Sequence, residues 1–167
     1  MTRPTPERFR EVLGHVPTSV VLITSAGENG PVGMAIGSFV SVSLEPLLIG
    51  FFPARTSTSW PLIRSADCFC VNILADDQAS LSRTFATQGG DKFQHTSWRT
   101  GPGGAPIIDG CVAWIACALA HEVDAGDHTL VLARVNALDL SRDAPALVFH
   151  RGDYASTAIA AIAEGTA

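Results

Sequence analysis

The chain has 167 residues, of which 11 are basic and 16 are acidic, so its net charge is −5. The basic residues are scattered, and this argues against a nucleic-acid-binding protein, because such a protein concentrates Lys and Arg along a phosphate-tracking surface. The longest apolar run, residues 47–52, is far shorter than the roughly 20 residues of a membrane-spanning helix, and residues 2–10 do not form a signal peptide. We therefore expect one compact cytoplasmic domain that has neither nucleic acid nor a membrane as its partner.

The apolar residues of the chain indicate how it assembles and what its cysteines do. The mean hydropathy of +0.26 is high for a soluble domain and predicts a subunit interface or a large apolar cleft. The four cysteines have apolar neighbours and form no CxxC pair, so they are expected to be small core residues in a reducing compartment and not zinc ligands. They are Cys68, Cys70, Cys111 and Cys117.

The N-terminal segment predicts a helix followed by a hairpin. Thr5 can cap a helix that has Pro6 in its first turn, and Pro17 ends this segment. Apolar residues recur on one face at the i, i+3, i+4 and i+7 spacing of a helix. They are Phe9, Val12, Leu13 and Val16. Residues 19–25 are β-branched and predict a strand, and the glycine-containing turn at 26–31 leads into the second strand of the hairpin.

The middle of the chain alternates between strands and short helices. Strands are predicted at 38–43, where apolar and hydroxyl residues alternate, and at the apolar runs 47–52 and 68–74. A short helix follows Ser59 to about Ser65, with Ser59 as its cap. A longer helix is predicted over 76–87, with Leu81 and Phe85 facing inward.

The C-terminal half predicts a long connection and three more strands. Residues 88–109 are rich in Gly, Pro and polar residues, which indicates a functional loop or a segment packed on a neighbouring subunit. Strands are expected at 111–121, 128–140 and 146–150, the first two joined by a turn at 124–127. Six or more strands with few helices predict a mainly β domain that forms a closed or nearly closed barrel.

Three polar segments are candidates for binding a ligand, in a chain that lacks the dinucleotide, P-loop, zincin and hydrolase signatures. Residues 33–43 are rich in Gly and Ser, which would admit a planar ligand or, as the preferred interpretation, relieve a bend in a barrel strand. Residues 55–59 combine a guanidinium with four hydroxyls ahead of a helix, a set that suits a phosphate.

The third segment is the turn 126–128, which delivers His128 to the start of a strand. A metal site built from His121, Glu122, Asp124 and His128 is not favoured, because strand alternation points these side chains in different directions. No metal is predicted.

In combination, these segments resemble the flavin reductase family with the FMN-binding split-barrel fold, in particular the small reductase components of two-component flavin-dependent monooxygenases. The resemblance covers nearly the whole chain. It rests on the following segments, in family order: Phe9-Arg10, Pro17-Thr18, VGMAIGSFVSVSLEP (32–46), STSW (57–60), FCVNIL (69–74), DKF (91–93), GDH (126–128) and RGDY (151–154).

The resemblance implies a mainly β, Greek-key-like split barrel with a few flanking helices over residues 1–154, followed by a separable tail, 155–167. It further implies an NAD(P)H-dependent flavin reductase that transfers hydride from NADH or NADPH to FAD or FMN and supplies reduced flavin to a partner oxygenase. A homodimer is implied as well. The alternative is a non-catalytic flavin-binding protein or flavin carrier of the same fold.

The resemblance also implies the roles of single residues. His128 would orient the nicotinamide. Residues 31–35 would line the flavin ring together with Gly37 and Ser38. The residues implied to bind the cofactors are Met34, Ala35, Gly37, Ser38, Pro53, Ala54, Thr58, Ser59, Phe85, Lys92, Arg151, Gly152, Asp153 and Tyr154. Many relatives have Thr-Ala-Ser-Ser-Phe where this chain has residues 35–39, AIGSF, so two hydroxyls are lost and the preference between FMN and FAD stays open.

Overall fold

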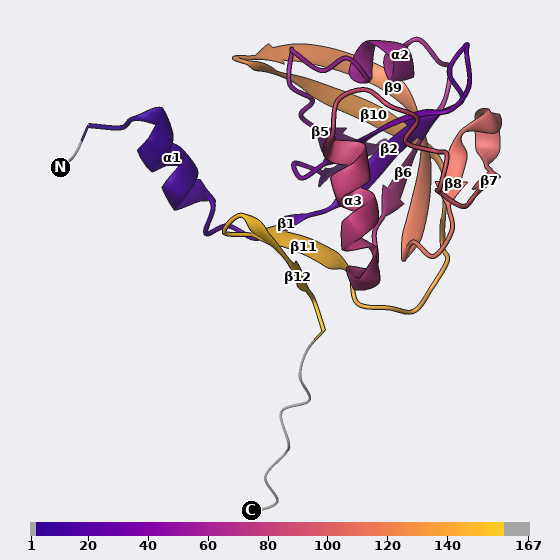
Figure 1. Ribbon diagram of the computed structural model, residues 1–167. Helices are drawn as coiled ribbons and strands as arrows, with labels where there is room; N and C mark the ends of the chain where they lie inside the picture. The colour runs from indigo at the N-terminus through magenta and orange to yellow at the C-terminus, as the bar shows by residue number, and fades with distance from the viewer. Residues whose placement is uncertain (1–2, 159–167) are drawn as a thin grey trace, which may run out of the picture.

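The computed structural model describes residues 3–158 and shows a mainly β domain with short helices on its outside (Figure 1). Its main sheet has seven strands in the order β3-β2-β6-β9-β10-β5-β4, with every neighbouring pair antiparallel. The sheet curls around a core, and β3 and β4 are its two edges. Its strands are β2 (Val21–Ser25), β3 (Val32–Ile36), β4 (Val40–Leu44), β5 (Leu47–Phe51), β6 (Phe69–Ile73), β9 (Ala113–Ala125) and β10 (His128–Leu140).

The first elements follow the sequence pattern closely. Thr5 caps α1 (Pro6–Leu13) by accepting a hydrogen bond from the Arg8 amide at 3.2 Å, as predicted. β2 and β3 form the predicted hairpin, in which every residue of β2 is buried. β1 (Thr18–Ser19) instead joins a small three-stranded sheet with β11 (Leu147–His150) and β12 (Asp153–Ser156).

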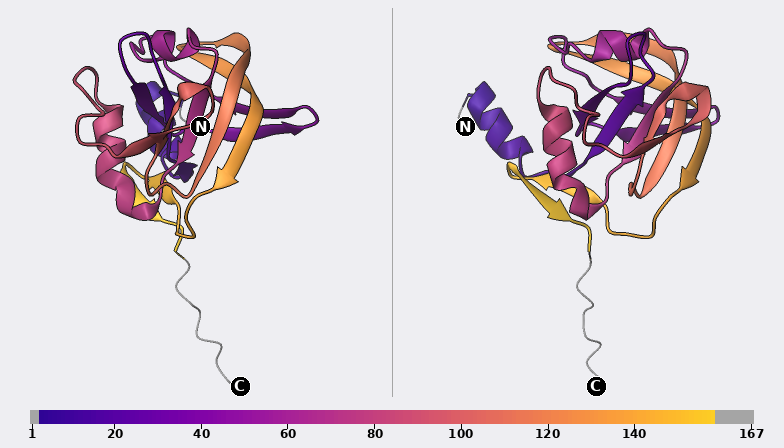
Figure 2. Two further views of the ribbon diagram at one scale, coloured as in Figure 1. Left: turned by 90° about the vertical axis from the view of Figure 1, so that its right-hand side faces the viewer. Right: turned by 45° about the vertical axis from the view of Figure 1, so that its right-hand side comes forward.

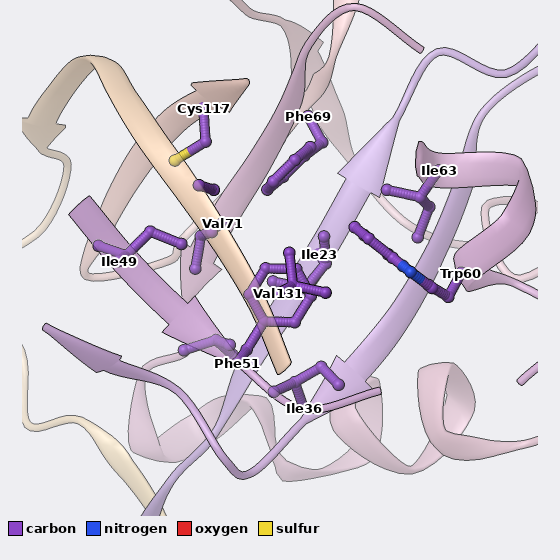
Figure 3. Close-up of a cluster of buried hydrophobic side chains, with 12 residues drawn as sticks. Ile23, Ile36, Ile49, Phe51, Trp60, Ile63, Phe69, Val71, Cys117 and Val131 are labelled. Carbon is purple, nitrogen blue, oxygen red and sulfur yellow. The ribbon is translucent and has the colours of Figure 1, made fainter. Parts of the chain in front are cut away.

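The main core lies inside the curled sheet, where three aromatic side chains pack among aliphatic ones (Figure 3). Phe51, Phe69 and Trp60 meet edge to face, with ring centroids 5.3 to 6.0 Å apart. Trp60 begins the short helix α2 (Trp60–Arg64) and is 5% exposed, so this indole anchors α2 on the sheet. A second core cluster lies beneath α3 (Ala79–Ala86), where Phe85 and Phe93 pack at 5.0 Å.

The predicted helix at 76–87 consists of two pieces. A 3-10 turn, η1 (Asp76–Gln78), precedes α3, and Phe85 is buried as expected while Leu81 packs partly buried beside it. The helix ends because Thr87 adopts an extended backbone conformation. α3 packs directly against β3 (Figure 2).

The prediction of one long irregular connection at 88–109 was wrong in part. It contains β7 (Trp98–Thr100), the 3-10 turn η2 (Pro102–Gly104) and β8 (Pro106–Ile108), and β7 pairs with β8. The fully buried Asn72 attaches this ribbon to the sheet, because its amide donates to Thr24 Oγ1 at 3.0 Å and its carbonyl accepts from the Ile108 amide at 2.8 Å. The ribbon thus packs on its own chain.

The long strands differ from the prediction at their ends. β9 begins at Ala113 and continues to Ala125, so the turn to β10 is shorter than the predicted 124–127. β12 was not predicted, and its last residues, 155–156, lie within the predicted tail, most of which falls outside the described residues. None of the helices within residues 3–158 is long and apolar enough to cross a membrane.

The four cysteines are free, and three of them are fully buried, as expected for small core residues. Burial raises the pKa of the Cys70 and Cys117 thiols to about 12. These two thiols therefore behave as apolar packing groups at neutral pH.

Candidate functional site

A hollow of about 160 Å³ opens between β3, the loop that precedes α2, and the end of α3. It brings together seven of the residues predicted to bind a cofactor, from four separate segments of the sequence. These are Met34, Ala35, Ala54, Thr58, Ser59, Phe85 and Lys92. We call this hollow the β3–α3 hollow.

The loop before α2 supplies hydroxyl groups to the β3–α3 hollow. Ser59 is the N-cap residue of α2, as predicted, but its side chain makes no cap hydrogen bond, and the Trp60 amide donates instead to Ser57 Oγ at 3.1 Å. All four hydroxyl residues, Thr56 to Ser59, line the hollow. The Ser57 hydroxyl is already bonded to the start of α2, and the other three are the groups that remain for a ligand.

Gly33 explains how α3 reaches the edge of this hollow. A Cβ at Gly33 would lie 2.6 Å from a ring carbon of Phe85, so only glycine lets the Phe85 ring pack onto β3. Phe85 is 1% exposed and fixes the last turn of α3. Gly33, which was considered for the close approach of a ligand, is instead contacted by the Phe85 side chain of the protein itself.

Lys92 supplies a positive charge to the β3–α3 hollow. Its ammonium group donates to the carbonyl oxygens of Gly33 at 3.2 Å and Phe85 at 3.1 Å. Burial lowers the pKa of Lys92, and within residues 3–158 no carboxylate forms an ion pair with it. Among the described residues, none that lines the hollow is acidic. The hollow is therefore suited to an anionic ligand.

A second hollow, of about 210 Å³, lies on the other side of Ala35 and Ala86, which line both hollows. We call it the β12 hollow. It contains two predicted residues, Gly37 and Tyr154, that are absent from the first hollow. The Tyr154 hydroxyl donates to Ser82 Oγ at 2.9 Å, which fixes the phenol ring against α3.

His128 stands at the tip of the β9–β10 hairpin, beside the β3–α3 hollow. Its backbone pairs with Ala54, which lines the hollow, and the Thr129 amide donates to the Pro53 carbonyl at 3.0 Å. His128 Nδ1 lies 2.7 Å from Asp127 Oδ1, and this contact lowers the pKa of Asp127. Asp127 therefore orients the imidazole ring, which stays partly open to solvent.

The other predicted residues lie away from the β3–α3 hollow. Ser38 Oγ accepts from the Phe52 amide at 2.9 Å, so this hydroxyl holds the chain together, and Pro53 is buried. Arg151 and Gly152 have positive φ in the exposed turn between β11 and β12. Asp153, the first residue of β12, pairs with Arg83 at 3.7 Å.

Some residues of the β3–α3 hollow were missed. Ala86, Thr87 and Gln88 line it, and they follow Phe85 directly in the sequence. The available signal was the end of the helix itself, because the residues just beyond a buried helix terminus share its surroundings.

Three of the four residues considered for a metal site, Glu122, Asp124 and His128, have other partners. Glu122 accepts from the Trp60 indole at 2.7 Å and from Arg64 at 3.2 Å, and Asp124 pairs with Arg55 at 3.5 Å. Among residues 3–158, no three His, Cys, Asp or Glu side chains are grouped to hold a metal ion.

The residues that line the hollows fit a flavin nucleotide. Small alanine side chains leave flat surfaces for a ring system, and hydroxyls with one ammonium group suit a phosphate. A third hollow of about 220 Å³ shares Thr58, Ser59 and Lys92 with the β3–α3 hollow, which extends the space beyond a single ring system.

Comparisons with known proteins agree with this fit. Residues 13–158 match the model of the flavin reductase like domain. A flavin reductase of Pseudomonas putida is 47% identical over 150 residues, which cover 89% of this chain and 88% of that protein. The reductase subunit of a flavin-dependent monooxygenase of Rhodococcus jostii is 43% identical over 149 residues, covering 89% and 76%.

A solved structure is similar over nearly its whole length. The NADH:FAD oxidoreductase of Streptomyces globisporus, in complex with NAD and FAD fragments, superposes with a TM-score of 0.88 at 30% identity, covering 96% of this chain and 99% of that one. The fold, the lining of the hollows and the sequence matches lead to one conclusion: the chain belongs to the flavin reductase family.

Proposed function

We propose that this protein is an NAD(P)H:flavin oxidoreductase that reduces FAD or FMN and supplies the reduced flavin to a partner oxygenase. The observation that carries the proposal is the pair of hollows that share Ala35 and Ala86, because a hydride transfer needs two ligands side by side. The family membership of the chain and the reductase names of its relatives support the same activity.

The two cofactors supply the hydride chemistry, between the nicotinamide C4 and the flavin N5. The protein positions them. Lys92 and the hydroxyls of Thr58 and Ser59 hold negative charge in the β3–α3 hollow, and Ala35 leaves room for a ring. His128, oriented by Asp127, contacts the nicotinamide nucleotide at the entrance beside Ala54.

The segment Arg151 to Tyr154 belongs to this proposal as a second contact to the nicotinamide nucleotide. Tyr154 lines the β12 hollow, and the Arg83 guanidinium lies 4.6 Å from the centroid of its ring. Arg151 and Gly152 form the turn between β11 and β12, and this turn joins Phe149 and Tyr154, which both line the hollow.

The proposal also includes the oligomeric state and the cellular location. A homodimer is supported by the mean hydropathy of +0.26 and by exposed apolar side chains on several elements. A cytoplasmic location is supported by four free cysteines, which suit a reducing compartment.

The activity is tested by following NADH oxidation in air with the purified protein, with and without added FAD or FMN. Turnover that depends on free flavin is the expected result. Flavin binding without NADH oxidation would instead support the alternative, a flavin carrier of the same fold. An absence of both would overturn the proposal.

The role of His128 is tested separately. His128→Ala should raise the KM for the nicotinamide nucleotide or lower kcat, while the dissociation constant of the flavin stays nearly the same. His121→Ala, an exposed histidine on the same hairpin, is the matched control. Unchanged kinetics in His128→Ala would remove this residue from the site.

A further inference from the structure

The N-terminal arm, residues 3–16, leaves the body of the molecule with its apolar side chains uncovered. None of the residues of α1 is buried, and α1 stands apart from the sheet in Figure 1 and in the right view of Figure 2. Four large apolar side chains of the arm, three on α1 and one just beyond its end, are between 45% and 63% exposed. They are Phe9, Val12, Leu13 and Val16. The arm is tied to the body at its far end, where the Arg151 amide donates to the Gly14 carbonyl at 2.8 Å.

A helix as short as α1 needs a surface to pack against. Isolated helices of fewer than about 12 residues are marginal in water, and α1 has 8. The Thr5 cap and the Arg8–Glu11 ion pair at 2.7 Å add only small stabilising contributions. The regular apolar spacing on a single face therefore indicates that something outside the described part of this chain covers α1.

The β4–β5 hairpin presents a second uncovered apolar surface. It projects from the body on the side away from α3 (Figure 2, left), and its edge strand β4 has a strand partner on one side only within residues 3–158. Four large apolar side chains on it are 45% to 84% exposed. They are Val40, Val42, Leu44 and Leu47. The only charged residue among residues 40–47 is Glu45.

We propose that these two surfaces cover each other between two copies of the chain, so that α1 of each copy packs on the β4–β5 hairpin of the other. Both surfaces are present on every copy, and a twofold arrangement buries both pairs at once. Residues 3–16 and 40–47 are nearly all exposed and give each copy a contact of the size of a stable interface, roughly 20–30 residues a side. A different protein bound to either surface would leave the other uncovered.

This inference builds on the proposed homodimer and specifies its surfaces. The test measures the mass of the purified chain by sedimentation, without cofactors, for the wild type and for Phe9→Glu and Leu44→Lys. These positions are the most exposed apolar residues of α1 and of the hairpin, at 63% and 84%, so the folded single chain tolerates the change. Glu11→Lys, on the opposite face of α1, is the control, and circular dichroism verifies that each variant is folded.

The wild type and Glu11→Lys should have twice the 17.5 kDa of the chain. Each of the other variants should have a dimer dissociation constant raised on the order of 100-fold, because a charge is buried without a partner. An equimolar mixture of Phe9→Glu and Leu44→Lys should recover dimers, since in the mixed dimer one contact pairs the new carboxylate with the new ammonium and the other is unchanged.

The outcomes distinguish a failure of the homodimer from a failure of the two proposed contact surfaces. A monomeric wild type would overturn the homodimer and its surfaces together. A wild-type dimer that both substitutions leave intact would overturn the surfaces and keep the homodimer. Weakened single variants without recovery in the mixture would show that α1 and the hairpin do not contact each other.

Discussion

At the scale of single residues, Lys92 has the most direct consequence for binding. Its half-buried ammonium group bonds two neutral carbonyl oxygens and faces the β3–α3 hollow. Lys92→Met should raise the flavin dissociation constant by roughly 10- to 100-fold, the effect expected for the loss of a charged hydrogen bond. Flavin fluorescence titration measures it, and Lys92→Arg should lose less affinity. An unchanged dissociation constant in Lys92→Met would contradict a flavin contact.

Cys70 and Cys117 predict how stability changes in alkali. Burial raises both pKa values from 9.0 to about 12, so above pH 9.0 the unfolded chain releases protons that the folded chain keeps. The stabilisation is complete below pH 9.0 and is lost as the pH approaches about 12. Each thiol should lower the free energy of unfolding by about 1.4 kcal/mol per pH unit in this range.

Cys117→Ala tests this prediction. Its free energy of unfolding, measured in urea at several alkaline pH values, should fall less steeply than that of the wild type by the contribution of one thiol. Burial lowers the pKa of Lys92, which acts in the opposite direction in both proteins and cancels in the comparison. Parallel curves for the two proteins would show that the Cys117 thiol does not remain protonated in the fold.

Many of the residues that line the β3–α3 hollow were predictable where they belong to a motif that is continuous in the sequence. Thr58, Ser59 and Lys92 were expected at the site and line the same hollow. Ser38 and Ser57 show the limit, because a serine hydroxyl can serve the backbone or a ligand, and only the position of the Phe52 or Trp60 amide decides between them. The cofactor roles of all these residues remain predictions.

At the scale of elements, α2 and the β9–β10 hairpin are held together by a single carboxylate. Glu122 accepts from the buried Trp60 indole with one oxygen and from Arg64 with the other. The loop before α2 lines the β3–α3 hollow, and the hairpin carries His128, so this contact links the two parts of the proposed site.

Glu122→Ala should therefore affect both stability and binding. The indole N–H of Trp60 would lose its acceptor, at a cost of about 1–3 kcal/mol in the free energy of unfolding. The KM for the nicotinamide nucleotide should rise together with the flavin dissociation constant, since both sides of the contact move. Glu122→Gln keeps an acceptor and should restore most of both; if Glu122→Ala changed stability alone, the link to the site would be refuted.

The elements that the sequence did not predict owe their existence to distant partners. β7 and β8 have only three residues each in a segment rich in Gly and Pro, and Asn72 in β6 holds them in place. β12 follows a turn with Arg151 and Gly152 at positive φ, where turn residues gave no strand signal. The longer strands were predictable because their apolar patterns mark the core locally.

At the scale of the whole molecule, the hollows lie at the surface and not inside the curled sheet, whose interior is filled by the main core. A ligand there has an open path to solvent. We therefore expect the flavin to be a dissociable substrate: dialysis should remove it, and added flavin should restore NADH oxidation in full. Activity that persists after dialysis, with flavin still on the protein, would contradict this expectation.

The wall that the two hollows share consists of Ala35 and Ala86, each with a single methyl group beyond the backbone. Any larger residue at either position would intrude on both compartments at once. Under the proposed function, a substitution at either position would therefore change the preference for the flavin and the preference for the nicotinamide nucleotide together. Independent tuning has to use residues that border one compartment alone, such as Thr87 in the β3–α3 hollow and Phe149 in the β12 hollow.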